Sequence, residues 1–208
     1  INDRFGTLAD FDAMMAAANA HGLRVILDAV FNHVGMDSRY IDKAKTQNGA
    51  CASALSPFRP WFTSGSAGSD FGCAGGWGWS GWMGYVTIPE LVDANADARD
   101  YLFRGGSPQI PATAGGMSVS EYWIKRGISG WRYDVAQDIT HDFFQAMRPY
   151  VKQTYGSTET LMMGEVTGGC QPSGLSYING AELDSMKNYC FRDWGIPWWL
   201  GILVGLAA

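Results

Sequence analysis

A repeated step, in which a helix-like segment, a tight turn and a short apolar run follow one another, constrains the fold of this 208-residue sequence most strongly. In the first repeat, residues 8–18 place apolar side chains at helical spacing, and Gly22 is suited to end a helix. The apolar run 23–27 follows and leads into Asp28. Alternation of helices with short β-branched runs predicts an α/β protein with a parallel sheet.

Two later repeats end on carboxylates as well. The run 128–133 leads into Asp134, and the run 161–164 leads into Glu165. These two acids are 31 positions apart, and one βαβ unit takes roughly 30 residues. The spacing therefore predicts neighbouring parallel strands, whose carboxyl ends meet at one edge of the sheet. A further apolar stretch, 183–189, predicts a fourth strand.

A long segment separates the first acid from the second. Asp28 and Asp134 are 106 positions apart, which is far more than one crossover needs. Residues 36–94 are rich in Gly, Ser and aromatic residues and lack a helical period. We interpret them as a small inserted domain, because their Trp and Phe side chains require burial. The predicted organisation is therefore a barrel segment at 1–35, an insertion at 36–94 and a second barrel segment at 95–208.

Charge and composition limit the classes of partner that the protein is expected to bind. A formal net charge of −5 argues against nucleic acid, which is bound mainly through Lys and Arg, whereas neutral sugars need no charge match. The apolar tail 195–208 is shorter than the roughly 20 residues that span a bilayer, so no membrane role is expected. Trp82 lies in a Gly-rich, Trp-rich segment. Such tryptophans either pack a compact loop or offer flat faces to pyranose rings, with equal odds.

The four cysteines indicate which cellular compartment the protein could occupy. No CxxC pair occurs, so a zinc site is not expected. Cys51 and Cys73 lie in the same Gly/Ser-rich region; they are compatible with a disulfide in an oxidising compartment and equally with two free thiols. The compartment stays open, with an extracellular one slightly favoured.

Paired carboxylates at adjacent strand ends suit glycosidic bond cleavage. In a retaining enzyme the two carboxyl groups lie about 5–5.5 Å apart, and one attacks the sugar while the other protonates the leaving oxygen. Neighbouring strands roughly 4.8 Å apart can supply that separation. Arg132 lies two residues before Asp134, so both side chains should share a face of the strand, where a guanidinium would keep the carboxylate ionised.

Three segments resemble signatures of the α-amylase family of glycoside hydrolases (family 13). They are residues 28–33 (Asp-Ala-Val-Phe-Asn-His), 130–135 (Gly-Trp-Arg-Tyr-Asp-Val) and 164–166 (Gly-Glu-Val). The resemblance implies a partial (β/α)8 TIM barrel with a loop-rich domain B inserted after the third strand. It also implies retaining hydrolysis of α-1,4-glucosidic bonds in starch-like, maltooligosaccharide or cyclodextrin substrates, with transglycosylation as a related outcome.

Site residues follow from the same resemblance. Asp134 would be the nucleophile and Glu165 the general acid/base. Asn32 resembles a residue that sometimes binds calcium, so Ca²⁺ is an optional cofactor and none is required. The substrate-binding residues expected from the resemblance, the strand ends and the Trp-rich segment are His33, Arg132, Asp28, Tyr133 and Trp82.

Within the family, Gln137-Asp138 and residues 183–193 resemble the cyclomaltodextrinase and neopullulanase type. The family's fourth signature, a His-Asp pair, does not occur in the sequence, and the first two and last two barrel strands are missing. The chain also begins at Ile1 without Met, which suggests a fragment or a processed chain. We therefore expect these 208 residues to be inactive or poorly folded alone. The alternatives are a non-catalytic relative that acts as a carbohydrate-binding or accessory protein, and another barrel hydrolase with chance matches.

Overall fold

The chain forms two compact units in a computed structural model that describes residues 3–167 and 171–196. The first unit comprises Ile1–Ala29 and Ile124–Ala208, and the second is Val30–Trp123. The predicted insertion at 36–94 falls within the second unit, and its bounds stay a prediction. None of the described helices is long and apolar enough to cross a membrane. Most of the apolar tail lies outside the described residues.

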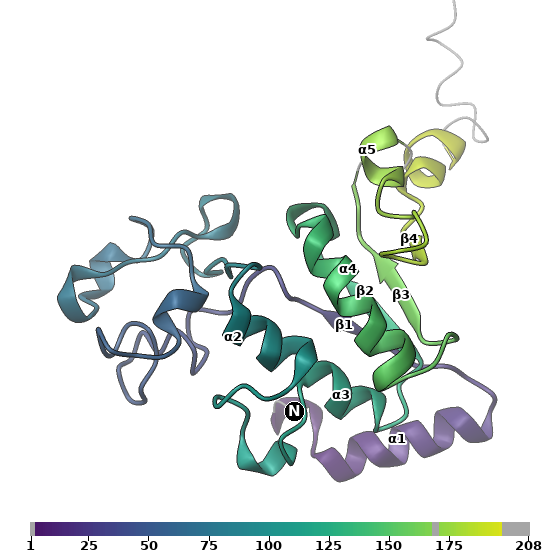
Figure 1. Cartoon of the computed structure of the whole chain (residues 1–208), viewed down its shortest axis with the longest axis horizontal. Coiled ribbons are helices and arrows are strands. Elements are labelled where there is room, and N and C mark those ends of the chain that lie inside the picture. The colour runs from purple at the N-terminus through teal and green to yellow at the C-terminus, as the bar shows by residue number, and fades with distance from the viewer. Residues whose placement is uncertain (1–2, 168–170, 197–208) are drawn as a thin grey trace, which may run out of the picture. The chain divides into compact units, whose positions relative to one another are not determined.

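The first unit is built on a parallel sheet with the strand order β1-β2-β3-β4 (Figure 1). The strands are β1 (Ile26–Ala29), β2 (Gly130–Tyr133), β3 (Leu161–Gly164) and β4 (Ser185–Met186). This confirms that the strands leading to Asp134 and Glu165 are parallel neighbours. The 106-position gap does not separate β1 from β2, since Asp28 pairs with Arg132 in register.

The first two strands begin later than predicted. The backbone N–H of Leu23 donates to the carbonyl of Ala18, so this residue completes the end of the preceding helix instead of entering the sheet. Gly127 turns the chain in the same way, with its N–H bonded to the carbonyl of Ile124 and a φ of 94°. In the first run, the end of the helix thus takes up the first apolar residue before the strand begins.

Helices occur in both units. Those described are α1 (Leu8–Ala20), α2 (Ala96–Arg99), α3 (Val119–Ile124), α4 (His141–Pro149) and α5 (Pro172–Leu175). Short 3-10 helices lie at Asp3–Phe5, Arg59–Trp61, Ser69–Phe71, Ala74–Gly76, Trp82–Gly84, Ala112–Ala114 and Ala136–Asp138, and π-helical turns at Asp100–Arg104, Tyr150–Thr154 and Phe191–Gly195.

Helix α1 begins with a reciprocal cap. The hydroxyl of Thr7 accepts from the N–H of Asp10, and the Asp10 carboxylate accepts from the N–H of Thr7. Two backbone donors that would otherwise lack partners are thereby satisfied. Helix α4 ends at Pro149, and the chain continues as a π-helical turn. The α-helix ends here because proline cannot donate the backbone hydrogen bond that an α-helix requires.

Helix α4 and the sheet share the core of the first unit. Phe143, Phe144 and Met147 are fully buried, and the ring of Phe144 lies 5.2 Å from that of Tyr133 on β2. Asp184, which precedes β4, accepts hydrogen bonds from Arg148 on α4, Lys152 and the N–H of Met162. This carboxylate therefore fixes where the short strand β4 starts.

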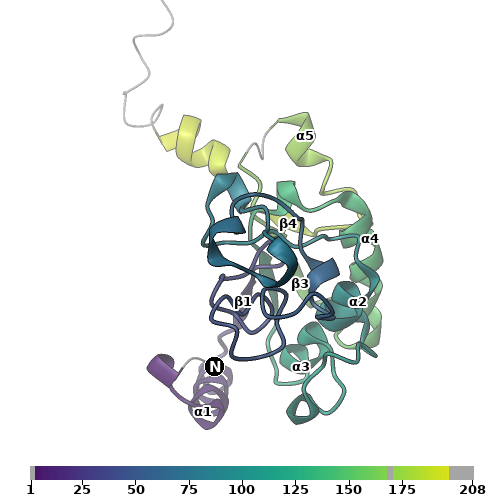
Figure 2. The ribbon, with the colours of Figure 1, turned by 90° about the vertical axis from the view of Figure 1, so that its left-hand side faces the viewer.

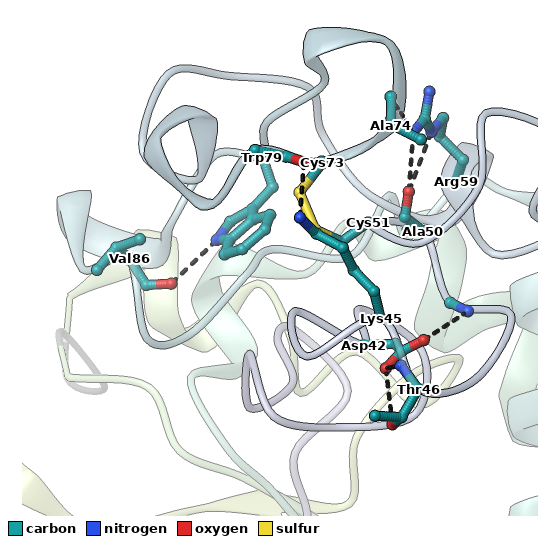
Figure 3. Close-up of a disulfide and its surroundings, with 12 residues drawn as sticks. Asp42, Lys45, Thr46, Ala50, Cys51, Arg59, Cys73, Ala74, Trp79 and Val86 are labelled. Carbon is teal, nitrogen blue, oxygen red and sulfur yellow. Dashed lines mark hydrogen bonds between the residues drawn. A yellow bond between two sulfur atoms is a disulfide. The ribbon is translucent and has the colours of Figure 1, made fainter.

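The second unit consists mainly of loops and single-turn helices, drawn in blue and teal in Figure 2. Cys51 and Cys73 form a disulfide (Figure 3), which decides between the two states that the sequence left open. Trp79 is fully buried and donates its indole N–H to the carbonyl of Val86. A Cβ on Gly68 would lie 2.3 Å from the Trp79 ring, so the close packing requires glycine.

Two polar side chains brace these loops (Figure 3). Arg59 donates to the carbonyls of Ala50 and Ala74, the neighbours of the two cysteines. Asp42 is buried, and burial alone would raise its pKa, but hydrogen bonds from the Thr46 and Gln47 backbone lower that pKa. The loops are thus held by backbone-directed hydrogen bonds as well as by the disulfide.

Candidate active site

One guanidinium joins the carboxylates at three strand positions. Arg132 NH1 lies 2.7 Å from Asp28 Oδ1 and 2.5 Å from Asp134 Oδ1, and its NH2 contacts Glu165 Oε2. The register pairs Arg132 with Asp28 across β1 and β2, and the two-residue period of β2 puts Asp134 on the same face as Arg132. The Arg132 side chain is only 12 % exposed. Arg132 and Asp134 are thus in contact, and the role of Arg132 in supporting Asp134 stays a prediction.

The backbone after β2 turns sharply. Val135 has a φ of 40° and a ψ of 47°, a left-handed conformation that is strained for a β-branched residue. The turn directs the Val135 N–H to Glu165 Oε2 at 3.3 Å. The ladder continues beyond it, because the Ala136 N–H donates to the Glu165 carbonyl. Backbone strain beside Asp134 is therefore tied to the placement of Glu165.

Glu165 receives donors on both oxygens. Oε1 accepts from the Tyr189 hydroxyl at 2.5 Å and from Lys187 Nζ at 3.1 Å, while Oε2 contacts Arg132 and the Val135 N–H. Burial alone would raise the pKa of Glu165, but these donors and the Arg132 charge lower it to about 2. The side chain, 14 % exposed, is therefore ionised at neutral pH.

Lys187 and Tyr189 were not among the predicted site residues. They follow β4, and the Lys187 N–H donates to the carbonyl of Gly164, so they occupy the next strand end beside Glu165. The predicted strand at 183–189 contained both residues. The strand itself has only two residues, Ser185 and Met186, which is too short for an alternating pattern to show that Lys187 and Tyr189 follow its end. Asp134 and Glu165 were selected because each follows a predicted strand, and the same criterion applied after Met186 would have pointed to Lys187.

Tyr133 does not line the site. Its side chain is fully buried and packs against Phe144 of α4, and burial raises its pKa well above the usual value. Neighbouring residues of a strand point to opposite faces, so Tyr133 must face the helix when Arg132 faces the carboxylates. The prediction that Tyr133 binds substrate is therefore wrong.

The second unit holds the other candidates. The rings of His33 and Trp82 are stacked, with centroids 5.3 Å apart and planes at 19°, and both side chains are half-buried. His33 forms an antiparallel bridge with Glu90. The structure thus brings His33 and Trp82 together within one unit.

Asn32 was the expected calcium ligand. It is 7 % exposed, and its amide Nδ2 lies 3.4 Å from His33 Nδ1. Calcium takes six to eight oxygen ligands, among which carboxylates are frequent. Within residues 3–167 and 171–196, no three His, Cys, Asp or Glu side chains come together in a way that could hold a metal ion. Calcium binding by Asn32 stays a prediction, and calcium enters no step below.

A comparison with family models gives a match to the family described as alpha amylase, catalytic domain, over residues 1–75 and 111–197. The chain belongs to this alpha-amylase family. Its parallel sheet is accordingly part of the TIM barrel that the family shares. The match stops short of residues 76–110, within the loop-rich second unit.

Relatives of known name cover most of this chain. An amylopullulanase of Thermoanaerobacterium thermosulfurigenes is 30 % identical over 207 residues, covering 93 % of this chain and 10 % of the relative. Neopullulanase 2 of Thermoactinomyces vulgaris is 28 % identical, covering 93 % of this chain and 28 % of the relative. The chain therefore spans less than a third of the length of these proteins.

Solved structures agree. A cyclic alpha-maltosyl-(1→6)-maltose hydrolase from Arthrobacter globiformis superimposes with a TM-score of 0.68 at 27 % identity, covering 90 % of this chain and 36 % of that one. A debranching enzyme from Nostoc punctiforme gives a TM-score of 0.68 at 28 % identity, covering 89 % and 34 %. The fold of this chain is thus similar to the corresponding part of both of these solved enzymes.

Proposed function

We propose that the protein is a retaining glycoside hydrolase acting on α-1,4-glucosidic bonds of α-glucans. The observation that carries this proposal is the contact of one guanidinium, that of Arg132, with both Asp134 and Glu165. Two carboxylates that contact the same guanidinium at adjacent strand ends can approach each other to the separation of about 5–5.5 Å that a retaining pair needs. Asp134 is also the more exposed of the two, at 21 % against 14 %, as suits a group that must reach the sugar.

The mechanism takes two displacements. Glu165, ionised in the free protein, first takes up a proton from solvent water. Asp134 then attacks the anomeric carbon while Glu165 gives that proton to the departing glycosidic oxygen, which leaves a covalent glycosyl-enzyme and a free sugar end. Glu165, now ionised, takes a proton from water, whose oxygen attacks the anomeric carbon and releases Asp134. A sugar hydroxyl in place of water would give transglycosylation. Arg132, in contact with Asp134, orients this carboxylate throughout.

Binding of the saccharide is proposed for three further residues. Asp28 contacts Arg132 and would help to orient that guanidinium. Its side chain is 58 % exposed, so it is also accessible to a saccharide. His33 would contact the sugar in the central subsite, and Trp82, stacked against it, would offer an aromatic face. The names of the relatives, among them neopullulanase and cyclomaltodextrinase, support starch, pullulan and cyclodextrins as the substrates to compare.

The test uses the protein expressed from its complete reading frame and these three substrates. We expect the wild type to release reducing sugar and Asp134→Asn and Glu165→Gln to lose at least about 1000-fold in kcat, because each removes a group that reacts directly. Asp12→Asn is the matched control, since Asp12 is an exposed acid paired with Arg126. Tight maltooligosaccharide binding without hydrolysis by the wild type would instead favour the carbohydrate-binding alternative. Unchanged hydrolysis in both acid variants would contradict the assignment.

A further inference from the structure

The donors around Glu165 divide between its two oxygens. Oε2 faces Arg132 and the Val135 N–H, neither of which can accept a hydrogen bond. A proton on Oε2 would therefore point at other hydrogens. Oε1 faces Lys187 and Tyr189, and of these the ammonium only donates, whereas the phenol can reverse and accept. The catalytic proton is therefore best accommodated on Oε1, which is the oxygen that Tyr189 covers.

We propose, on the basis of the proposed function, that Lys187 and Tyr189 are positioning residues that cap Glu165 Oε1 and hold the acid/base in its ionised form until a saccharide oxygen displaces the Tyr189 hydroxyl. The glycosidic oxygen then takes the place of the phenol beside Oε1. Oε1 takes up a proton from solvent water as the phenol leaves, and it passes this proton to the glycosidic oxygen when the glycosidic bond breaks. Lys187 opposes protonation of Oε1 by its charge, and Tyr189 opposes access to it.

The position of both side chains is built into the fold. The Lys187 N–H continues the β3–β4 ladder by bonding to the Gly164 carbonyl, and the Tyr189 N–H bonds to the Lys187 carbonyl. The Arg192 guanidinium lies over the Tyr189 ring, 4.3 Å from its centroid. A stacked ring on a short hydrogen-bonded segment can present its hydroxyl to Glu165 reproducibly, yet it remains half-buried and can be displaced at its tip.

The charged and titratable groups facing Glu165 come from three elements. Arg132 comes from β2 and carries with it Asp134 and, from β1, Asp28. Lys187 and Tyr189 follow β4, with Arg192 behind the phenol. Lys187 is the member of this set whose positive charge can be removed without breaking the contacts between Arg132 and the carboxylates. It is therefore the residue to vary.

A carboxyl titration tests the lysine without any substrate. The Glu165 carboxyl carbon is followed by ¹³C NMR against pH in the protein expressed from its complete reading frame, with no substrate present. In Lys187→Met the midpoint should rise by on the order of one pH unit, a roughly 10-fold gain in proton affinity. Lys187→Arg should keep the low midpoint, and Lys125→Met, at an exposed lysine of the same unit, should leave it unchanged. An unaltered midpoint in Lys187→Met, with the fold verified by NMR, would overturn the proposal.

Kinetics and binding test the capping in the protein from its complete reading frame. The fall of kcat/KM at high pH should shift to higher pH in Lys187→Met, because Glu165 then stays protonated over a wider range. Tyr189→Phe should bind maltotriose more tightly than the wild type by calorimetry, since no hydroxyl has to be displaced. Weaker binding would overturn the capping role. A titration shift accompanied by no hydrolysis at any pH would refute the proposed function while supporting the lysine's control of Glu165.

Discussion

The guanidinium of Arg132 contacts carboxylates from three strand positions at once. Arginine can do this because its planar group carries five donors in a fixed fork, whereas lysine concentrates its charge in one ammonium. Without that cation, Asp28, Asp134 and Glu165 would be neighbouring anions with no shared counter-charge. We therefore expect Arg132 to contribute to the stability of the first unit, in addition to the role in catalysis that we propose for it.

The stability effect of Arg132 should depend on pH in a defined direction. The pKa of Glu165 is lowered from 4.5 to about 2, so its ionisation stabilises the fold above about pH 4.5, and this contribution disappears as the pH falls toward 2. In Arg132→Met, Glu165 keeps its other donors but loses the Arg132 charge that helps to lower its pKa, so that pKa rises. The loss of unfolding free energy relative to the wild type should thus be largest at neutral pH and shrink on acidification.

Urea unfolding of both proteins at several pH values measures this difference. Arg126→Met is the control, because Arg126 forms a more exposed pair with Asp12, and exposed pairs contribute about 0–1 kcal/mol. A loss in Arg132→Met that stays constant from neutral to acid pH would show that the guanidinium acts by packing and not by charge.

At the scale of the element, strand β3 agrees with its predicted range 161–164, while β1 and β2 begin later. Strand β1 begins later because the N–H of Leu23 is hydrogen-bonded to the end of helix α1. The pattern of apolar residues does not reveal such a bond. Alternation along β2 predicted Arg132 beside Asp134 correctly, and the same alternation should have excluded Tyr133. Lys187 and Tyr189 were missed because a strand of two residues leaves no periodic signal.

The end of β3 also requires a glycine. A Cβ on Gly164 would lie 2.5 Å from Leu183 Cδ1 and 3.2 Å from the Ala136 Cβ. Gly164→Ala should therefore destabilise the protein by about 1–3 kcal/mol through overpacking and weaken the placement of the adjacent Glu165. Gly35→Ala, where nothing lies within 4 Å of an added Cβ, should be tolerated. Thermal unfolding of both variants measures the difference in stability. Equal unfolding midpoints for Gly164→Ala and Gly35→Ala would contradict the packing argument.

At the scale of the whole molecule, the sequence indicated the α/β class and the family, because three motifs in order and in register constrain a barrel far more than any one does. It could not decide the state of Cys51 and Cys73, which depends on loop geometry that composition does not encode. The expectation that these 208 residues are inactive alone stays a prediction. Reducing-sugar assays on the isolated chain would test it, and full starch hydrolysis would contradict it.

The central claim is that Asp134 forms a covalent bond with the sugar while Glu165 serves as acid and base. An α-glucosyl fluoride carrying an extra ring fluorine slows the release of such an intermediate, so the labelled protein can be digested and analysed by mass spectrometry. We predict a glycosyl mass increment on the peptide that contains Asp134, which is absent in Asp134→Asn and present in Asp12→Asn. A label on another residue, or hydrolysis with inverted anomeric configuration and no label, would contradict the claim.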